Sequence, residues 1–332
     1  MKKNIIVKDY KSILNVHDTQ IAIKLVKDTF EDKLSQKLDL IRVTAPLFVE
    51  PSTGLNDELS GVEKAVNFMA HDSRTNLEIV QSLAKWKRHA LYKYNCDGIY
   101  TDMNAIRPFE ETDNIHSLYV DQWDWERVIS SEDRNINYLK ETVQTIYDVL
   151  LETYLVLNER FPQIKHDLPE KIEFVTSKEL EEKYPSLDRK AREREICKIH
   201  KAVFLMQIGH PLTDGKPHDT RAADYDDWLL NGDILLYYEP LDIAFEISSM
   251  GIRVNKESLI DQLKIKNENH KLNFKYHQDI INEVLPLTIG GGIGQSRMCM
   301  FMLKKAHIGE VQASFWSKED IQTFEENNIF LL

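Results

Sequence analysis

A short turn between two apolar runs constrains the fold of this 332-residue chain more than any other feature. Ile234–Tyr238 and Ile243–Ser248 have the length and composition of strands. The four residues between them, Glu239-Pro240-Leu241-Asp242, are typical of a tight hairpin turn. Such a hairpin indicates an antiparallel pair, and it favours an α+β domain over a doubly wound parallel sheet.

Periodic patterns elsewhere fit the same class. Helices are predicted at 18–38, 135–158, 188–200 and 295–303. Asp18 can cap the first of them, and the last begins near Gln295. Strand-like runs lie at 40–46, 77–82, 115–125, 172–175 and 202–208. The polar segment 264–275 is expected to lie at the surface. Ser60 and Glu63 have the spacing of a capping box. We therefore predict one α+β domain over 1–332, with a mainly antiparallel sheet flanked by helices.

Charge and composition exclude several classes of protein. The formal net charge is −12, and apart from Lys85, Lys87 and Arg88 no basic stripe is evident, which argues against extended RNA contact. By default these lysines would be solvated at the surface. The three cysteines lie far apart, without zinc or disulfide spacing. The apolar run Ile5-Ile6-Val7 is too short for a signal peptide, and no later run approaches a membrane span, so we expect a cytoplasmic protein.

A glycine run near the end of the chain points to a nucleotide. Gly290–Gly294 follows the apolar stretch 285–289 and opens the last helix, where glycine permits close approach of a ligand and free N–H groups can bind it. Gln295 breaks the dinucleotide-binding register, and no Walker lysine follows. A turn without a ligand is equally compatible with glycine alone. Arg297 opposes the helix dipole there and so suits a bound anion or base, which makes Gly292, Gly294 and Arg297 candidate nucleotide contacts.

Polar residues occupy strand positions that would normally be apolar. Alternation over 120–126 puts Asp121 with the two tryptophans on one face and three polar side chains on the other: Gln122, Asp124 and Glu126. A surface edge strand is one explanation. Because Trp123 and Trp125 should be buried, the polar face could instead line a cleft that binds the amino and carboxyl groups of a small zwitterion.

Two carboxylates face each other across the predicted hairpin. With the turn at 240–241, Leu235 lies opposite Glu246, and Asp233 is the diagonal neighbour of Glu246, roughly 7–8 Å away. The two charges would repel unless a Mg²⁺–ATP complex bridges them, although Arg253 could also neutralise them. Arg107 follows the strand-like run 99–103. Its guanidinium could bind a phosphate through two N–H groups, or it could form a surface ion pair.

Seven segments together resemble ammonia-dependent asparagine synthetase, the aspartate–ammonia ligase family, over essentially the whole chain. In order along the sequence they are 57–66, 82–88, 119–126, 224–228, 231–234, 245–253 and 290–297. The resemblance implies a class II aminoacyl-tRNA synthetase core without an anticodon-binding domain. It also implies a homodimer, with the helix at 18–38 and the strand closed by Pro46 near the subunit interface.

The same resemblance implies roles for individual residues. Arg107 would contact the ATP α-phosphate and Arg297 would pack on adenine, while Asp233 and Glu246 would position ATP and Mg²⁺. The implied substrate pocket consists of Asp57, Lys87, Gln122, Asp124, Asp226, Ser249 and Arg253.

The implied reaction has two steps. Aspartate attacks ATP to give β-aspartyl-AMP and diphosphate, and ammonia then displaces AMP, with Asp57 or Asp226 as the base that deprotonates ammonium. A truncated aminoacyl-tRNA synthetase and a catalytically inactive paralogue are the alternatives. The junction Trp228-Leu229-Leu230-Asn231 is shorter than is usual for the family, so either a loop is lost or a stretch is omitted.

Overall fold

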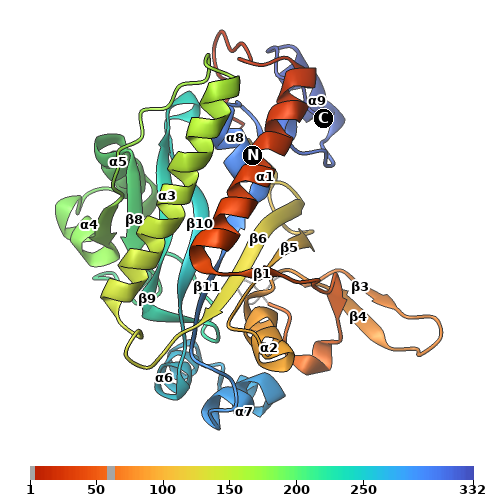
Figure 1. Cartoon of the computed structure of the whole chain (residues 1–332), viewed down its shortest axis with the longest axis vertical. Helices are drawn as coiled ribbons and strands as arrows, with labels where there is room; N and C mark the ends of the chain where they lie inside the picture. Colours follow the sequence, from red (N-terminus) through yellow and green to blue (C-terminus); the bar gives the residue numbers. More distant parts are fainter. Residues whose placement is uncertain (1–3, 58–63) are drawn as a thin grey trace.

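One large sheet organises the molecule in the computed structural model, which describes residues 4–57 and 64–332 (Figure 1). The predicted capping pair Ser60 and Glu63 lies outside these residues. Only the outermost pairs, β1 with β5 and β7 with β8, are parallel, so the prediction of a mainly antiparallel sheet is confirmed. The eight strands run in the order β1 (Ile41–Arg42), β5 (Gly98–Ile106), β6 (Tyr119–Val128), β11 (Thr288–Gly294), β10 (Ile243–Arg253), β9 (Asp226–Tyr238), β8 (Ala202–Met206) and β7 (Glu173–Thr176).

One face of the sheet is covered by long helices. Figure 1 shows α1 (Val16–Leu38) and α3 (Ile136–Arg160) side by side across it, with α8 (Gln295–Met302) behind. Trp123 and Trp125 point into this layer and are fully buried, and the ring of Phe30 stacks on Trp123 at 4.8 Å. This burial confirms the predicted alternation on β6, and it leaves the polar side chains of β6 on the opposite face.

The opposite face is covered only at its two sides. On one side α2 (Ala84–Tyr94) packs with Ile99 and Met103 of β5, and on the other α5 (Arg189–His200) packs with Val203 and Leu205 of β8. Both helices also contact the inner strands, α2 contacting β6 and β11 and α5 contacting β10 and β9. Between the two apolar clusters, residues of β6, β11 and β10 still line a cavity.

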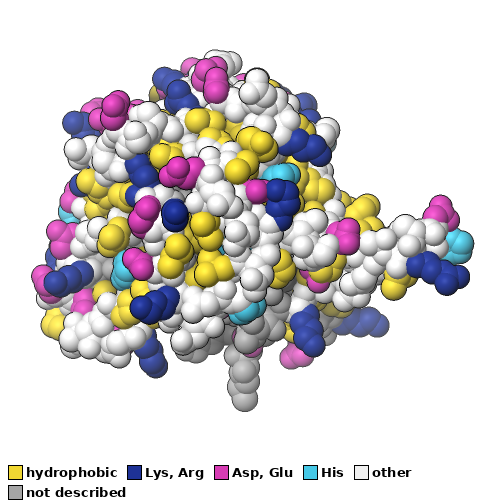
Figure 2. Space-filling view, turned by 90° about the horizontal axis from the view of Figure 1, so that it is seen from below, with side chains coloured by type: hydrophobic (Ala, Val, Ile, Leu, Met, Phe, Trp, Pro, Cys, Tyr) yellow, Lys and Arg dark blue, Asp and Glu magenta, His cyan; other side chains and the backbone are white. Residues whose placement is uncertain are grey.

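The remaining elements lie outside this framework. A small three-stranded sheet projects from the body, and its hairpin ends in the exposed residues His71, Asp72 and Arg74 (Figure 2). Among the described residues, no helix is both long and apolar enough to cross a membrane. The remaining bounds are β2 (Phe48–Val49), β3 (Asn67–Met69), β4 (Asn76–Ile79), α4 (Ser177–Lys183), α6 (Lys256–Lys266), α7 (Lys275–Ile281) and α9 (Lys318–Glu325).

Several predicted boundaries are wrong for local reasons. The first helix begins at Val16, because Asn15 is the cap and its side chain accepts a hydrogen bond from the backbone N–H of Asp18. The strand expected over 40–46 is only the short β1. The polar segment 264–275 is mostly exposed, as was expected, and it holds the end of α6, a 3₁₀ turn and the first residue of α7. The helix at Gln295 is not the last, since α9 follows it.

The glycine run is itself a strand, and α8 begins directly after it, so the expected junction before a helix is confirmed and the alternative of a turn is not. As β11 it lies between β6 and β10 and pairs with both along its length. Its missing side chains make room for those of β6: a Cβ on Gly290 would lie 2.0 Å from Oε2 of Glu126, and one on Gly292 would lie 2.5 Å from Oε1 of Gln122. Glycine is therefore needed here for lateral space across the sheet.

The short junction predicted at 228–231 is an ordered irregularity of β9. Asn231 pairs with Gly251, and Asp226 pairs with Arg253. The register changes between these two pairs, so the residues of β9 between them form a bulge. Trp228 in this bulge is buried, and its backbone N–H donates to Gln262 Oε1 at 2.9 Å. The junction is thus held by packing and hydrogen bonds.

Candidate active site

A cavity of about 470 Å³ lies on the uncovered face of the sheet over β6, β10 and β11. This volume falls in the range of small-molecule and cofactor sites. Of the predicted site residues only Asp233 is absent from its lining. The others are Asp57, Lys87, Arg107, Gln122, Asp124, Asp226, Glu246, Ser249, Arg253, Gly292, Gly294 and Arg297.

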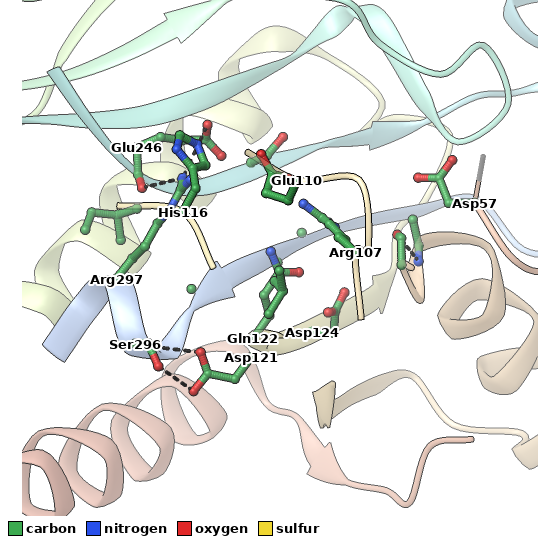
Figure 3. A pocket seen from close by; sticks show the side chains of 18 of the residues that line it. Asp57, Arg107, Glu110, His116, Asp121, Gln122, Asp124, Glu246, Ser296 and Arg297 are labelled. Atoms are coloured by element: carbon green, nitrogen blue, oxygen red, sulfur yellow. Dashed lines mark hydrogen bonds and ion pairs between the residues drawn. The ribbon is translucent and has the colours of Figure 1, made fainter. Parts of the chain in front are cut away.

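The lining residues divide along the length of the cavity. Figure 3 shows Arg297, Glu246 and His116 gathered at one end and Asp57 at the other, with Arg107 and Gln122 between them.

The lysines predicted to be solvated are buried instead. Lys87 donates to Asp124 and, at 2.7 Å, to the carbonyl oxygen of Gly291, while Lys85 donates to Asp224 at 3.2 Å. Burial lowers the pKa of Lys87, although the Asp124 carboxylate opposes that shift. The sequence did not reveal this burial, because α2 places its basic side against carboxylates that are remote in the chain.

Arg253 links two carboxylates at the base of the cavity. Its Nε donates to Oε1 of Glu126 at 3.0 Å, its Nη2 donates to Oε2 of the same residue at 2.7 Å, and its Nη1 donates to Asp226. All three side chains are buried. Burial raises the pKa of Asp226 above its ordinary value against the opposing pull of Arg253.

Two arginines in the cavity have spare hydrogen-bonding capacity. Arg107 follows directly after β5, and its Nη2 donates to Gln81 at 3.3 Å, while its buried Nε has no partner in the described part of the chain. Arg297, in the first turn of α8, donates to the carbonyl oxygen of Glu246 at 3.2 Å. A buried unsatisfied N–H is costly, so Arg107 is suited to an anionic ligand that supplies the missing acceptor.

The predicted register of the hairpin holds for Glu246 but not for Asp233, and Asp233 has a partner that was not predicted. Glu246 faces Leu235, as expected, and a bulge after Glu246 sets Asp233 opposite Ser249. Arg221 pairs with Asp233 and donates to Ser249 Oγ at 2.8 Å. Arg253, the alternative partner considered from the sequence, is held by Glu126 instead. Burial raises the pKa of Asp233, which Arg221 opposes. Arg221 thus covers Asp233, which explains why Asp233 is missing from the lining.

Sequence reasoning missed some lining residues, notably Arg221 and His116. His116 Nδ1 lies 2.9 Å from Asp113 Oδ1, three residues earlier, in a loop without periodicity. Arg221 also lies in an irregular loop, and the only available signal was its closeness to the segment 224–228. Neither residue could be assigned without the fold, because loop residues carry no periodic pattern.

Comparison with known proteins identifies the family. The model of the family described as aspartate–ammonia ligase matches residues 17–328. The chain belongs to this family. The aspartate–ammonia ligase of Clostridium perfringens (strain SM101) is 54% identical over 336 aligned residues, covering 100% of both chains. The enzyme of the same name from Fusobacterium nucleatum is 57% identical over 326 residues, covering 97% of this chain and 99% of its own.

Solved structures support the fold at low sequence identity. Asparaginyl-tRNA synthetase from Pyrococcus horikoshii, complexed with asparaginyl-adenylate, superposes with a TM-score of 0.67 at 16% identity, covering 89% of this chain and 68% of its own. The Entamoeba histolytica asparaginyl-tRNA synthetase gives 0.65 at 13% identity, covering 90% and 66%. The fold is therefore the class II aminoacyl-tRNA synthetase core, as the resemblance implied.

Proposed function

We propose that the protein synthesises asparagine from aspartate, ammonia and ATP, with release of AMP and diphosphate. The observation that carries this proposal is one cavity in which two arginines with spare donors, Arg107 and Arg297, share a sheet face with the buried Lys87–Asp124 and Arg253–Asp226 pairs. The arginines suit a nucleotide, and the paired charges suit a small zwitterion. The adenylate named for the Pyrococcus neighbour is the same kind of intermediate. Nothing in the site favours tRNA charging.

In the proposed first step a carboxylate of aspartate attacks the α-phosphate of ATP. Activation is needed because oxide is a poor leaving group, whereas AMP is a good one. Arg107 would stabilise the charge that develops on the phosphate oxygens, and Arg297 would pack on adenine. Gln122 and Asp124, on the polar face of β6, would orient the substrate between them.

Mg²⁺ is part of this proposal, with Asp233 and Glu246 as its protein ligands. Oδ1 of Asp233 is buried without a hydrogen-bond partner in the described residues, which fits a cation ligand. Arg221, which pairs with Oδ2 and separates Asp233 from the cavity, would have to move aside for the ion to bind. No group of three metal-binding side chains occurs within the ranges that the structure describes, so phosphate oxygens and water would complete the shell, as is usual for Mg²⁺. Bound there, the ion would neutralise phosphate charge.

We further propose that the protein acts as a cytosolic homodimer built from a single domain over 1–332. Exposed apolar side chains on β1, on the small sheet and on the connection between them support an interface there: Ile41, Leu47, Phe48, Phe68 and Met69. The net charge of −12 supports small-molecule rather than nucleic-acid partners.

A product assay tests the reaction. The protein is mixed with ATP, Mg²⁺, aspartate and ammonium, and asparagine and AMP are measured against mixtures that lack ammonium or contain glutamine instead. We expect asparagine and AMP in equal amounts, only when ammonium is present. Release of ADP would rule out the adenylate, and aspartate-dependent tRNA charging without asparagine would rule out the proposed ligase activity.

We assign the base of the ammonia step to Asp57, which lines the cavity at the end opposite Arg297 and so away from the proposed adenine, and we keep Asp226 as the alternative. Asp57→Asn should keep aspartate-dependent ATP–diphosphate exchange within about threefold of the unmodified protein, while asparagine formation falls about a hundredfold, a typical contribution of a general base. Asp226→Asn is the comparison and should lose both activities, since it also frees Arg253. Equal loss of both activities in Asp57→Asn would contradict the assignment.

A further inference from the structure

A buried carboxylate lies behind the cavity without lining it. Glu126 of β6 is 0% exposed, and it accepts three hydrogen bonds from Arg253 and a fourth from Thr288 Oγ1 at 2.7 Å. Burial alone would raise the pKa of Glu126, but the guanidinium of Arg253 holds that pKa below its ordinary value. The carboxylate is therefore charged and fully satisfied by these donors.

The arrangement fixes the orientation of Arg253. A guanidinium has five N–H donors; Glu126 takes Nε–H and one N–H of Nη2, and Asp226 takes one of Nη1. Two donors remain, and Arg253 lines the cavity, so these are the groups available to a ligand. Because the carboxylate of Glu126 holds one edge of the guanidinium through two hydrogen bonds, the remaining N–H donors of Arg253 point in a defined direction.

The strand register makes room for this pair. Glu126 lies opposite Gly290 on β11, where a Cβ would stand 2.0 Å from Oε2 of Glu126 and 2.7 Å from Nη2 of Arg253. The glycine therefore allows the ion pair to lie flat on the sheet beneath the cavity.

The register also indicates which end of aspartate Arg253 would meet. Arg107 follows Ile106, which faces Tyr119 on β6, and Glu126 is seven residues further along that strand. At about 3.3 Å per residue the two positions are roughly 23 Å apart along the backbone. The Glu126–Arg253 pair therefore lies far along β6 from the strand end that carries Arg107, and on this ground we expect Arg253 to meet the carboxylate of aspartate that is not activated.

We propose that Glu126 is a positioning residue, which aims Arg253 at the α-carboxylate of aspartate and so sets the affinity for this substrate. The inference rests on the proposed function, which it deepens. Its effect should be confined to aspartate, because Glu126 acts through Arg253 and touches no residue assigned to ATP.

The test is steady-state kinetics of Glu126→Gln, a replacement of the same shape without the charge. We expect KM for aspartate to rise at least tenfold, while KM for ATP stays within threefold. Thr288→Val, which removes only the hydroxyl donor, should raise KM for aspartate two- to fivefold, and it replaces the first variant if that one does not fold. Isothermal titration calorimetry with aspartate alone should show that the affinity for aspartate is highest in the unmodified protein, lower in Thr288→Val and lowest in Glu126→Gln.

A matched control separates positioning from stability. Glu310 is also a buried glutamate, bonded to the hydroxyl of Tyr10, and it does not line the cavity. Glu310→Gln should lower the melting temperature and leave both KM values unchanged. Unchanged KM for aspartate in Glu126→Gln, or an equal rise for aspartate and ATP, would overturn the inference alone. If the unmodified protein forms no asparagine, the proposed function fails first and the inference fails with it.

Discussion

Arg107→Ala is expected to reduce aspartate-dependent ATP–diphosphate exchange by about a thousandfold, the upper range for removing one donor to a developing oxyanion. The physical reason is that the Arg107 guanidinium has a buried Nε without a partner in the described residues, and an α-phosphate would supply the acceptor. Exchange is measured with labelled diphosphate, without ammonium, so that the adenylation step is observed separately.

The control for this variant is Arg194→Ala. Arg194 lies on α5 and is 44% exposed in its side chain, and its ion pairs within the described part of the chain are with the surface residues Glu195 and Asp242, so exchange should stay within twofold. Gel filtration should give the same size for both variants and the unmodified protein. Normal exchange in Arg107→Ala would remove this arginine from the adenylation step.

Gly290→Ala is expected to have the second large effect, on stability and activity together. The new methyl group would displace Glu126 from Arg253, since Oε2 of Glu126 would lie 2.0 Å from the added Cβ. Disruption of a fully buried ion pair costs roughly 3 kcal/mol or more of the free energy of unfolding. Urea unfolding should give this loss, and KM for aspartate should rise as in Glu126→Gln.

Gly292→Ala provides the comparison on the same strand. Its added Cβ would meet the side-chain amide of Gln122 at 2.5 Å, which is the end of a side chain that can rotate away. We expect a stability loss of about 1 kcal/mol or less, with the loss of activity confined to substrates that Gln122 contacts. If Gly290→Ala proves no less stable than Gly292→Ala, the buried pair is not what requires glycine on β11.

Local pattern was sufficient where a feature depends on neighbouring residues. Alternation along β6 correctly separated the buried Trp123 and Trp125 from the polar Gln122 and Asp124, because a strand turns successive side chains to opposite faces. The hairpin register was also predictable, since a short turn fixes which residues meet, and Glu246 does face Leu235. Every site residue that the family resemblance implied lines the cavity, with the exception of Asp233.

Only the tertiary structure decided how the charges are paired. Lys87 meets Asp124 across 37 residues and Gly291 across 204, and Arg253 meets Glu126 across 127. Such contacts depend on strand order and helix packing, and no local period encodes them. The ion pair between Arg221 and Asp233 and the conformation of the glycine run also depend on the tertiary structure. From its composition the run was expected at the opening of a helix, with a bulge or turn as the alternative. It is a strand because β6 and β10 pair with it on both sides, and the helix begins directly after it.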